Sequence, residues 1–253
     1  MDFSNKVAIS TGAASGMGLL FADNFASLGG DVVMCDVNEQ TLAERVAEIN
    51  AKGKGRVIGV KCDVRDYSQV CAARDMAVEA FGRIDIVANF AGGTAVRVQK
   101  VDTEKYPEFP DVPIEVFDWG IDVNLKGPFY FAHAVLKQMR KQQSGLIINI
   151  GSITGAEGTK YGMDYSTSKA GLMYGLTKSI AQFGEKYGIR CVCVSPGPVL
   201  TRAAMANMKT LLGRAADPQE IIDLVLFIAS DKGQFINGEN IMIDGGRNAM
   251  KRM

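Results

Sequence analysis

Two tyrosine–lysine pairs are the side chains of this sequence best suited to moving a proton. Tyr165 and Lys169 are four residues apart in a helical stretch, so they share one face of the predicted helix and the ammonium can approach the phenol. Tyr174 and Lys178 repeat this spacing nine residues later, about half a turn around the helix, so only one pair can face a substrate. Ser152 favours the first pair, because a Gly-Ser sequence ends a predicted strand thirteen residues before Tyr165.

Positive charge beside a phenol would give it a role in acid–base catalysis. A tyrosine with the usual pKa of about 10 stays protonated at neutral pH unless such a charge favours the phenolate. We expect Lys169 to supply the charge, so that Tyr165 takes a hydroxyl proton during alcohol oxidation and returns it during reduction. Ser152 would hydrogen-bond the substrate oxygen as charge develops. Asn124, in mid-helix where asparagine is unfavourable, would hold a water linking Lys169 to solvent; a buried structural amide is the alternative.

A glycine-rich turn between the first predicted strand and helix is suited to binding phosphate. In Thr11-Gly12-Ala13-Ala14-Ser15-Gly16-Met17-Gly18, free backbone N–H groups and the helix dipole face a ligand, and glycine lets it approach closely. The spacing is GxxxGxG and not GxGxxG, so a tight turn without a ligand is the alternative. The predicted pyrophosphate contacts are Gly12, Ser15, Gly16, Met17 and Gly18.

The acidic residue at the end of the second predicted strand indicates which dinucleotide would bind. Asp36 follows Gly18 by 18 residues, close to the spacing of about 20 at which a carboxylate meets the adenosine ribose. It would repel the 2′-phosphate of NADP, and neither the glycine turn nor Val37-Asn38 offers a basic residue to bind that phosphate. NAD is therefore predicted over NADP, with Val37 as a further contact. The alternative is that Asp36 only ends the strand and Asn38 caps the next helix.

Two further strand ends fall where open α/β sheets bind ligands. Cys62-Asp63-Val64 follows the third predicted strand and Asn89-Phe90-Ala91-Gly92 the fourth. The predicted contacts to adenine and ribose are Cys62, Asp63, Val64, Asn89, Ala91 and Gly92.

Short β-rich runs alternate with helical segments along the chain. Strands are predicted at 7–11, 31–36, 56–63, 84–89, 145–152, 189–195 and 240–244, and helices at 16–28, 39–51, 67–81, 113–141, 163–187 and 218–230. This alternation predicts one α/β domain over residues 1–253, doubly wound, with a seven-stranded parallel sheet covered by helices on both faces.

Composition and charge exclude several classes of protein. The 28 basic and 28 acidic residues give no electrostatic basis for binding nucleic acid or an anionic membrane. No apolar run approaches the ~20 residues that span a bilayer, and the start lacks a signal-peptide pattern, so a cytoplasmic protein is expected. The five cysteines lack ligand spacing and the only histidine, His133, lies among apolar residues. We expect buried thiols, no metal site, and neither zinc alcohol dehydrogenase chemistry nor a Ser-His-Asp hydrolase.

Taken together, these motifs resemble the short-chain dehydrogenase/reductase family over nearly the whole chain. The resemblance rests on residues 11–18, Asp63, residues 89–92, Asn124, Ser152, Tyr165, Lys169 and Pro196-Gly197. It implies a Rossmann-like sheet and a catalytic tetrad of Asn124, Ser152, Tyr165 and Lys169. It also implies that Tyr165 and Lys169 contact the cofactor, whose oxidised nicotinamide adds positive charge near the phenol. Further nicotinamide contacts are expected from the loop after the sixth strand, at Pro196, Gly197, Val199 and Thr201.

The resemblance implies an NAD(H)-dependent oxidoreductase that interconverts a secondary alcohol and a ketone. A polyol, a sugar acid and a hydroxysteroid stay open as substrates. A 3-oxoacyl thioester reductase is an alternative, weakened because the positions of its expected basic residues are Gln143 and Tyr187, although Lys141 and Lys186 are adjacent. A non-catalytic NAD-binding scaffold is another. The family further implies a homotetramer, or a homodimer, paired through helices 113–141 and 163–187.

Two segments and one residue depart from the family pattern or extend it. Phe90 replaces a smaller or polar residue beside the expected ribose. The stretch 93–112, with Arg97, Lys100, Lys105, Tyr106, Phe109 and two prolines, is predicted to be a substrate loop, with a solvated insertion as the alternative. A short lid is expected near 200–214. Four residues between Ser152 and Tyr165 would also line the substrate pocket: Glu157, Thr159, Tyr161 and Met163.

Overall fold

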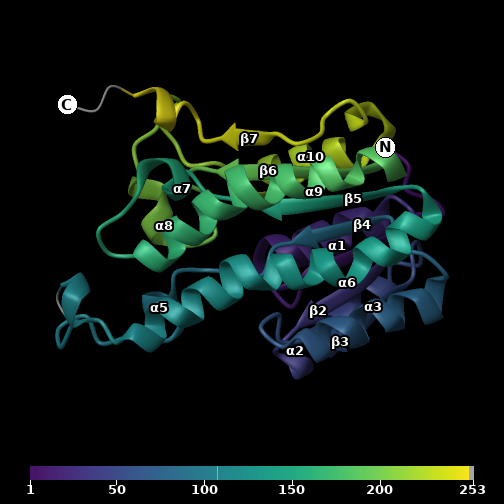
Figure 1. Cartoon of the computed structure of the whole chain (residues 1–253), viewed down its shortest axis with the longest axis horizontal. Helices are drawn as coiled ribbons and strands as arrows, with labels where there is room; N and C mark the ends of the chain where they lie inside the picture. Colours follow the sequence, from purple (N-terminus) through teal and green to yellow (C-terminus); the bar gives the residue numbers. More distant parts are fainter. Residues whose placement is uncertain (107, 251–253) are drawn as a thin grey trace.

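A computed structural model describes residues 1–106 and 108–250, and its centre is a seven-stranded sheet (Figure 1). All adjacent strands are parallel and follow the order β3-β2-β1-β4-β5-β6-β7. The strands are β1 Val7–Thr11, β2 Asp31–Asp36, β3 Val57–Lys61, β4 Ile86–Asn89, β5 Gly145–Ile150, β6 Ile189–Pro196 and β7 Asn240–Ile243. The order reverses direction at β1, so the chain crosses to the other half of the sheet between β3 and β4. This confirms the predicted doubly wound, Rossmann-like α/β fold.

Helices cover both faces of this sheet. The elements are α1 Gly16–Ser27, α2 Glu39–Asn50, α3 Tyr67–Phe81, α4 Ala95–Val98, α5 Ile114–Ile121, η2 Asp122–Lys126, α6 Gly127–Gln142, α7 Thr154–Glu157, α8 Met163–Ala170, η3 Gly171–Leu176, α9 Thr177–Gly184 and α10 Pro218–Ala229. Short helical turns complete the set: η1 Phe109–Asp111, η4 Glu185–Tyr187, η5 Ala203–Asn207, η6 Asp231–Gly233 and η7 Arg247–Ala249. Asn38 caps α2 by accepting from the Thr41 amide, and Asp66 caps α3.

Alternate residues of each central strand enter two separate cores. Ala8, Val32 and Ile148 pack toward α1 and α10, whereas Ile9, Val33 and Ile147 pack toward α3, α6 and α9 (Figure 1). Because both faces are covered, the central strands are mostly apolar and buried along most of their length, with few polar residues such as Ser10 and Asn149. Four of the five cysteines are buried in this interior, as predicted, whereas Cys71 is partly exposed; all five are free thiols.

Both long predicted helices contain a widened, π-helical turn. The stretch 113–141 is α5, η2 and α6, and the stretch 163–187 is α8, η3, α9 and the short turn η4. Such bulges are frequent at functional sites. Here η2 contains Asn124 and η3 begins two residues after Lys169. Hydrophobic periodicity predicted the helices but not these bulges, because one extra residue in a turn changes the pattern very little.

The remaining differences from prediction are small. Strand β3 is shorter at both ends than the predicted 56–63, and β5 ends at Ile150 rather than at 152. The single-turn helices α4 and α7 were not predicted, since four residues are too few to show a helical period. Within the described chain, no helix combines the length and hydropathy needed to cross a bilayer.

Candidate active site

The carboxyl ends of the parallel strands surround one large pocket of about 1090 Å³. Most of the predicted site residues line it: Gly12, Ser15, Gly16, Met17, Gly18, Asp36, Val37, Cys62, Asp63, Val64, Ala91, Gly92, Ser152, Tyr165, Lys169, Pro196, Gly197, Val199 and Thr201. Two predicted residues, Asn89 and Asn124, lie behind its wall. A cavity of this size accommodates a ligand larger than a simple alcohol.

The glycine turn forms the floor at one end of this pocket. Gly16 has φ +59°, and a Cβ built on it would meet no atom within 4 Å, so the space above its backbone is open. Ser15 does not cap α1 through its side chain, and the first turn of a helix leaves backbone N–H groups without intrahelical acceptors. These N–H groups and the positive helix end could hold a diphosphate.

The same turn leaves no room for larger residues beneath that space. A Cβ on Gly18 would lie 2.5 Å from the Gly12 carbonyl oxygen, and a Cβ on Gly12 would lie 2.9 Å from the Ala91 Cα. Gly12 also has φ +62°, a conformation that favours glycine.

We expect Gly12→Ala to weaken NADH binding about tenfold or more, because the methyl group would push the turn away from Ala91. Gly53→Ala is the matched control, since Gly53 has a similar φ of +68° but open space around its Cβ position. Both variants lose some stability from backbone strain. Fluorescence titration with NADH should separate them; equal affinities in the two variants would contradict a tight turn beneath the cofactor.

Asp36 is held at the end of β2 by two backbone amides. Its carboxylate accepts from the Ala14 N–H at 3.0 Å and from the Asn38 N–H at 2.9 Å. The first bond ties β2 to the glycine turn, which places the carboxylate beside the open space over Gly16. A group that accepts from Ala14 in this way keeps lone pairs to accept from sugar hydroxyls.

Next to Asp36, at the end of β3, the pocket contains an ion pair that sequence reasoning missed. Arg65 donates to Asp63 through Nη2 at 2.6 Å and through Nε at 3.0 Å. Hydrogen bonding from this guanidinium lowers the pKa of Asp63, with burial opposing the shift. In the sequence, the i,i+2 spacing of Asp63 and Arg65 was the signal that could have indicated this ion pair.

Phe90, which departs from the family pattern, packs against Phe21 with ring centroids 5.6 Å apart and still lines the pocket.

Asn89 occupies the interior of the sheet. It is 2% exposed, and its Nδ2 donates to Asn149 Oδ1, whose own Nδ2 donates to Thr177. The amide therefore links β4, β5 and α9. Its direct contact with a cofactor stays a prediction, since the side chain does not line the pocket.

Lys169 lies beneath Tyr165 on α8. Its Nζ is 5.4 Å from the centre of the Tyr165 ring and donates to the Ile150 carbonyl at 2.6 Å. The side chain is only 4% exposed, and burial lowers its pKa from 10.5 to about 8. Burial raises the pKa of Tyr165, while Ser152, Arg202 and Arg97 oppose that rise. Sequence reasoning expected the charge at Lys169 and did not foresee the two arginines.

Asn124 sits inside the η2 bulge and is fully buried. Its Nδ2 donates to the carbonyls of Gly93 and Gly120, and its Oδ1 accepts from the Gly93 N–H. A Cβ on Gly92 would lie 2.6 Å from Asn124 Oδ1 and 3.5 Å from Lys169 Nζ, so both groups flank the same glycine. The amide thus fastens the loop after β4 next to Lys169, and both its donors are used.

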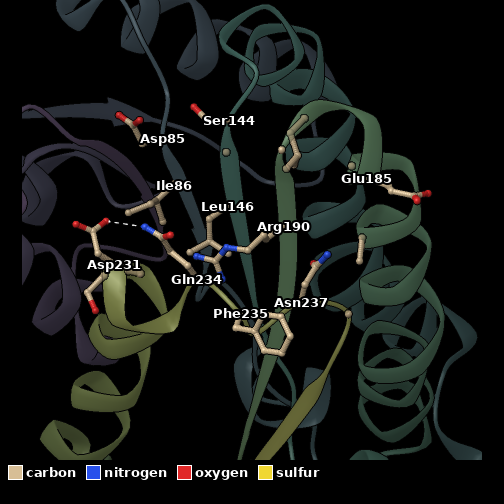
Figure 2. Close-up of a pocket in the computed structure, with 18 of the residues that line it drawn as sticks. Asp85, Ile86, Ser144, Leu146, Glu185, Arg190, Asp231, Gln234, Phe235 and Asn237 are labelled. Carbon is tan, nitrogen blue, oxygen red and sulfur yellow. Dashed lines mark hydrogen bonds between the residues drawn. The ribbon is translucent and has the colours of Figure 1, made fainter.

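The second tyrosine–lysine pair faces away from this pocket. Tyr174 is 51% exposed, and Lys178 lines a different hollow of about 890 Å³. Figure 2 shows this second hollow with Arg190 and Asn237 among its lining residues. That hollow lies at the amino-terminal ends of β5 and β6, and Arg190 within it donates to the carbonyls of Ile228, Gly233 and Ile236. None of the predicted site residues lines it. The fold therefore places only the Tyr165–Lys169 pair beside Ser152 in the large pocket.

The substrate side of the pocket is formed by several loops. Of the stretch 93–112, only its beginning lines the pocket, through Gly93, Thr94, Arg97 and Val98; Pro107 of that stretch lies outside the described residues. The segment 200–214 contributes Thr201, Arg202, Met205 and Met208. Glu157 also lines it and accepts from Arg247 of η7 at 3.1 Å.

Across residues 1–106 and 108–250, no group of three or more His, Cys, Asp or Glu side chains is placed to hold a metal ion.

Comparison with known proteins gives the family. A family model described as enoyl-(acyl carrier protein) reductase matches residues 12–248. The chain is 38% identical to a trans-4-hydroxycyclohexanecarboxylate dehydrogenase of Sinomonas cyclohexanicum, covering 97% of this chain and 94% of the relative. It is 32% identical to a 7alpha-hydroxysteroid dehydrogenase of Bacteroides fragilis (96% and 95% covered) and 34% identical to a 3-oxoacyl-[acyl-carrier-protein] reductase of Thermotoga maritima (97% and 99%). This chain belongs to the short-chain dehydrogenase/reductase family of oxidoreductases, whose dehydrogenases use nicotinamide cofactors.

Proposed function

We propose that this protein is an NAD(H)-dependent dehydrogenase that interconverts a secondary alcohol and a ketone. The observation that carries the proposal is that one pocket is lined both by the glycine turn, which leads into the uncapped start of α1, and by Ser152, Tyr165 and Lys169. A bound nicotinamide would accept or supply the hydride. The protein would supply the proton transfer and the positioning.

Tyr165 is the proposed general acid and base. During oxidation its phenolate oxygen accepts the hydroxyl proton of the alcohol, and Ser152 donates a hydrogen bond to the substrate oxygen that loses this proton. Lys169, anchored by the Ile150 carbonyl, keeps positive charge beneath the ring. Asn124 fastens the Gly93 loop, and we assign to it the water that exchanges protons between Lys169 and solvent.

NAD is the proposed cofactor because of Asp36. We expect Asp36→Ala to raise the NADP-to-NAD ratio of kcat/KM about tenfold, since the carboxylate no longer repels a 2′-phosphate. The Ala14 and Asn38 amides lose their acceptor, so Asp36→Asn, which keeps one acceptor oxygen without the charge, serves as the control for geometry. An unchanged ratio in both variants would contradict the role of the charge.

The proposed substrate is a secondary alcohol, since two of the similar dehydrogenases are named for hydroxycyclohexanecarboxylate and for a hydroxysteroid. The direct test mixes the protein with NAD⁺ and a panel that includes hydroxycyclohexanecarboxylate, polyols, sugar acids and hydroxysteroids, and follows NADH absorbance. NADH formation with any member supports the proposal; tight NADH binding without turnover of any alcohol or ketone favours the non-catalytic scaffold.

A 3-oxoacyl thioester reductase is the second candidate, since one relative carries that name. The positions at which such reductases are expected to carry basic residues for the acyl carrier protein, Gln143 and Tyr187, are not basic.

We further propose a homotetramer, because the helix faces expected to pair expose large apolar side chains. These include Phe129 on α6, Tyr174 on η3 and Phe183 on α9. Light scattering tests the assembly.

A further inference from the structure

The substrate end of the pocket carries two arginines without acidic partners. Arg97 comes from α4 and Arg202 from the segment after β6, so residues far apart in the sequence both line the pocket near Tyr165. In the described part of the chain neither guanidinium forms a salt bridge. Among residues 1–106 and 108–250, the only hydrogen bond of the Arg202 side chain is with the Met205 sulfur at 3.9 Å.

Each of the other charged side chains that line the pocket has a hydrogen-bonding partner. Arg65 is paired with Asp63, and Arg247 is paired with Glu157. Asp36 accepts from two backbone amides at the opposite, glycine-turn end. Lys169 is buried beneath Tyr165. The two unpaired arginines therefore leave net positive charge at the substrate end.

The position of Arg97 is constrained by the backbone of the site. A Cβ on Gly93 would lie 2.7 Å from Arg97 Nη2, so the guanidinium rests against Gly93, the residue whose amide and carbonyl hold Asn124. Asp164 precedes Tyr165 on α8, but its carboxylate is buried, accepts from the Ala95 amide and does not line the pocket. Both arginines also oppose the burial effect on the pKa of Tyr165, consistent with their closeness to the phenol.

Four apolar side chains also lie along the wall at this end: Val98, Trp119, Met205 and Met208. Resting on the proposed dehydrogenase function, we infer that the substrate is a hydroxy acid: a compact apolar body with the reacting hydroxyl at Tyr165 and a carboxylate bound by Arg97 and Arg202. Guanidinium groups match the planar geometry of a carboxylate, and such charge-assisted hydrogen bonds are among the strongest in proteins. A neutral steroid or a polyol would leave both arginines without an anionic partner.

The first test measures binding without turnover. Cyclohexanecarboxylate and cyclohexanecarboxamide have nearly the same shape and differ in charge, and each is titrated into the complex of the full-length protein with NADH by calorimetry. We expect the carboxylate to bind about 10- to 100-fold more tightly than the amide. Arg97→Gln and Arg202→Gln should each remove most of that advantage, Arg97→Lys should retain part of it, and Arg45→Gln on α2 should leave it unchanged.

The second test compares kcat/KM for hydroxycyclohexanecarboxylate with that for its carboxamide. The ratio should fall about tenfold or more in either arginine variant, while the Kd of NADH stays within about twofold of wild type. Equal binding of acid and amide by the wild type would overturn the inference. So would a loss of NADH affinity that accounts for the whole effect, because the arginines would then bind the cofactor.

These outcomes separate the inference from the proposed function. Oxidation of neutral alcohols without preference for acids would leave the dehydrogenase and remove the hydroxy-acid substrate. Arginine-dependent binding of the carboxylate without turnover of any alcohol would keep the anion site and remove the dehydrogenase.

Discussion

Tyr165→Phe is expected to lower kcat for alcohol oxidation by about 10²- to 10⁴-fold, the usual loss when a positioned acid–base group is removed. The change deletes one hydroxyl and keeps the ring that lies over Lys169. Binding of NADH should therefore stay close to that of wild type. Initial rates of NADH formation, with fluorescence titration of NADH, measure both quantities.

Tyr174→Phe is the matched control for this prediction. It makes the same chemical change nine residues away, on a side chain that is half exposed and does not line the pocket. We expect its rate to equal that of wild type. Oxidation that continues undiminished in Tyr165→Phe would show that another group transfers the proton.

Lys169→Met is expected to abolish turnover and yet stabilise the cofactor-free protein at neutral pH. Burial lowers the pKa of Lys169 from 10.5 to about 8, so keeping the ammonium charged in the fold costs about 3 kcal/mol at pH 7. Methionine removes this cost and fills a similar volume. The gain is reduced by the loss of a donor to the Ile150 carbonyl, which costs about 1–3 kcal/mol.

The pH dependence of stability has a definite sign. Between about pH 8 and 10.5 the unfolded lysine keeps its proton and the folded lysine does not, so this group makes wild type more stable as pH rises. The difference in unfolding free energy between Lys169→Met and wild type should therefore move in favour of wild type across this range. Urea denaturation at several pH values measures the difference, and subtraction removes the titration of cysteines common to both proteins.

Lys178→Met is the control for the lysine experiment. Lys178 is exposed and lies away from the pocket, so its substitution should change neither the rate nor the pH dependence. A constant stability difference between Lys169→Met and wild type from pH 7 to 10 would contradict a charged, buried lysine in the cofactor-free fold.

Local sequence pattern determined the fold and the nucleotide end of the site. The alternation of apolar runs with capped helical stretches was enough for a parallel α/β sheet, because strand and helix periodicities and caps such as Asn38 act within a few residues. The glycine turn and Asp36 were likewise found by spacing, since one strand–turn–helix–strand unit contains them both. The choice of Tyr165 over Tyr174 needed only a helical turn and Ser152.

Tertiary structure decided what the substrate end of the pocket contains. Arg97 and Arg202 are more than a hundred residues apart in the sequence, and no period or spacing relates them; only the fold places both of them at the pocket near Tyr165. The π-helical turns beside Asn124 and Lys169 are also products of packing, because each inserts one residue into an otherwise regular helix. Local chemistry thus indicated the proposed reaction centre, whereas the charge that would select its substrate depends on the tertiary placement of distant segments.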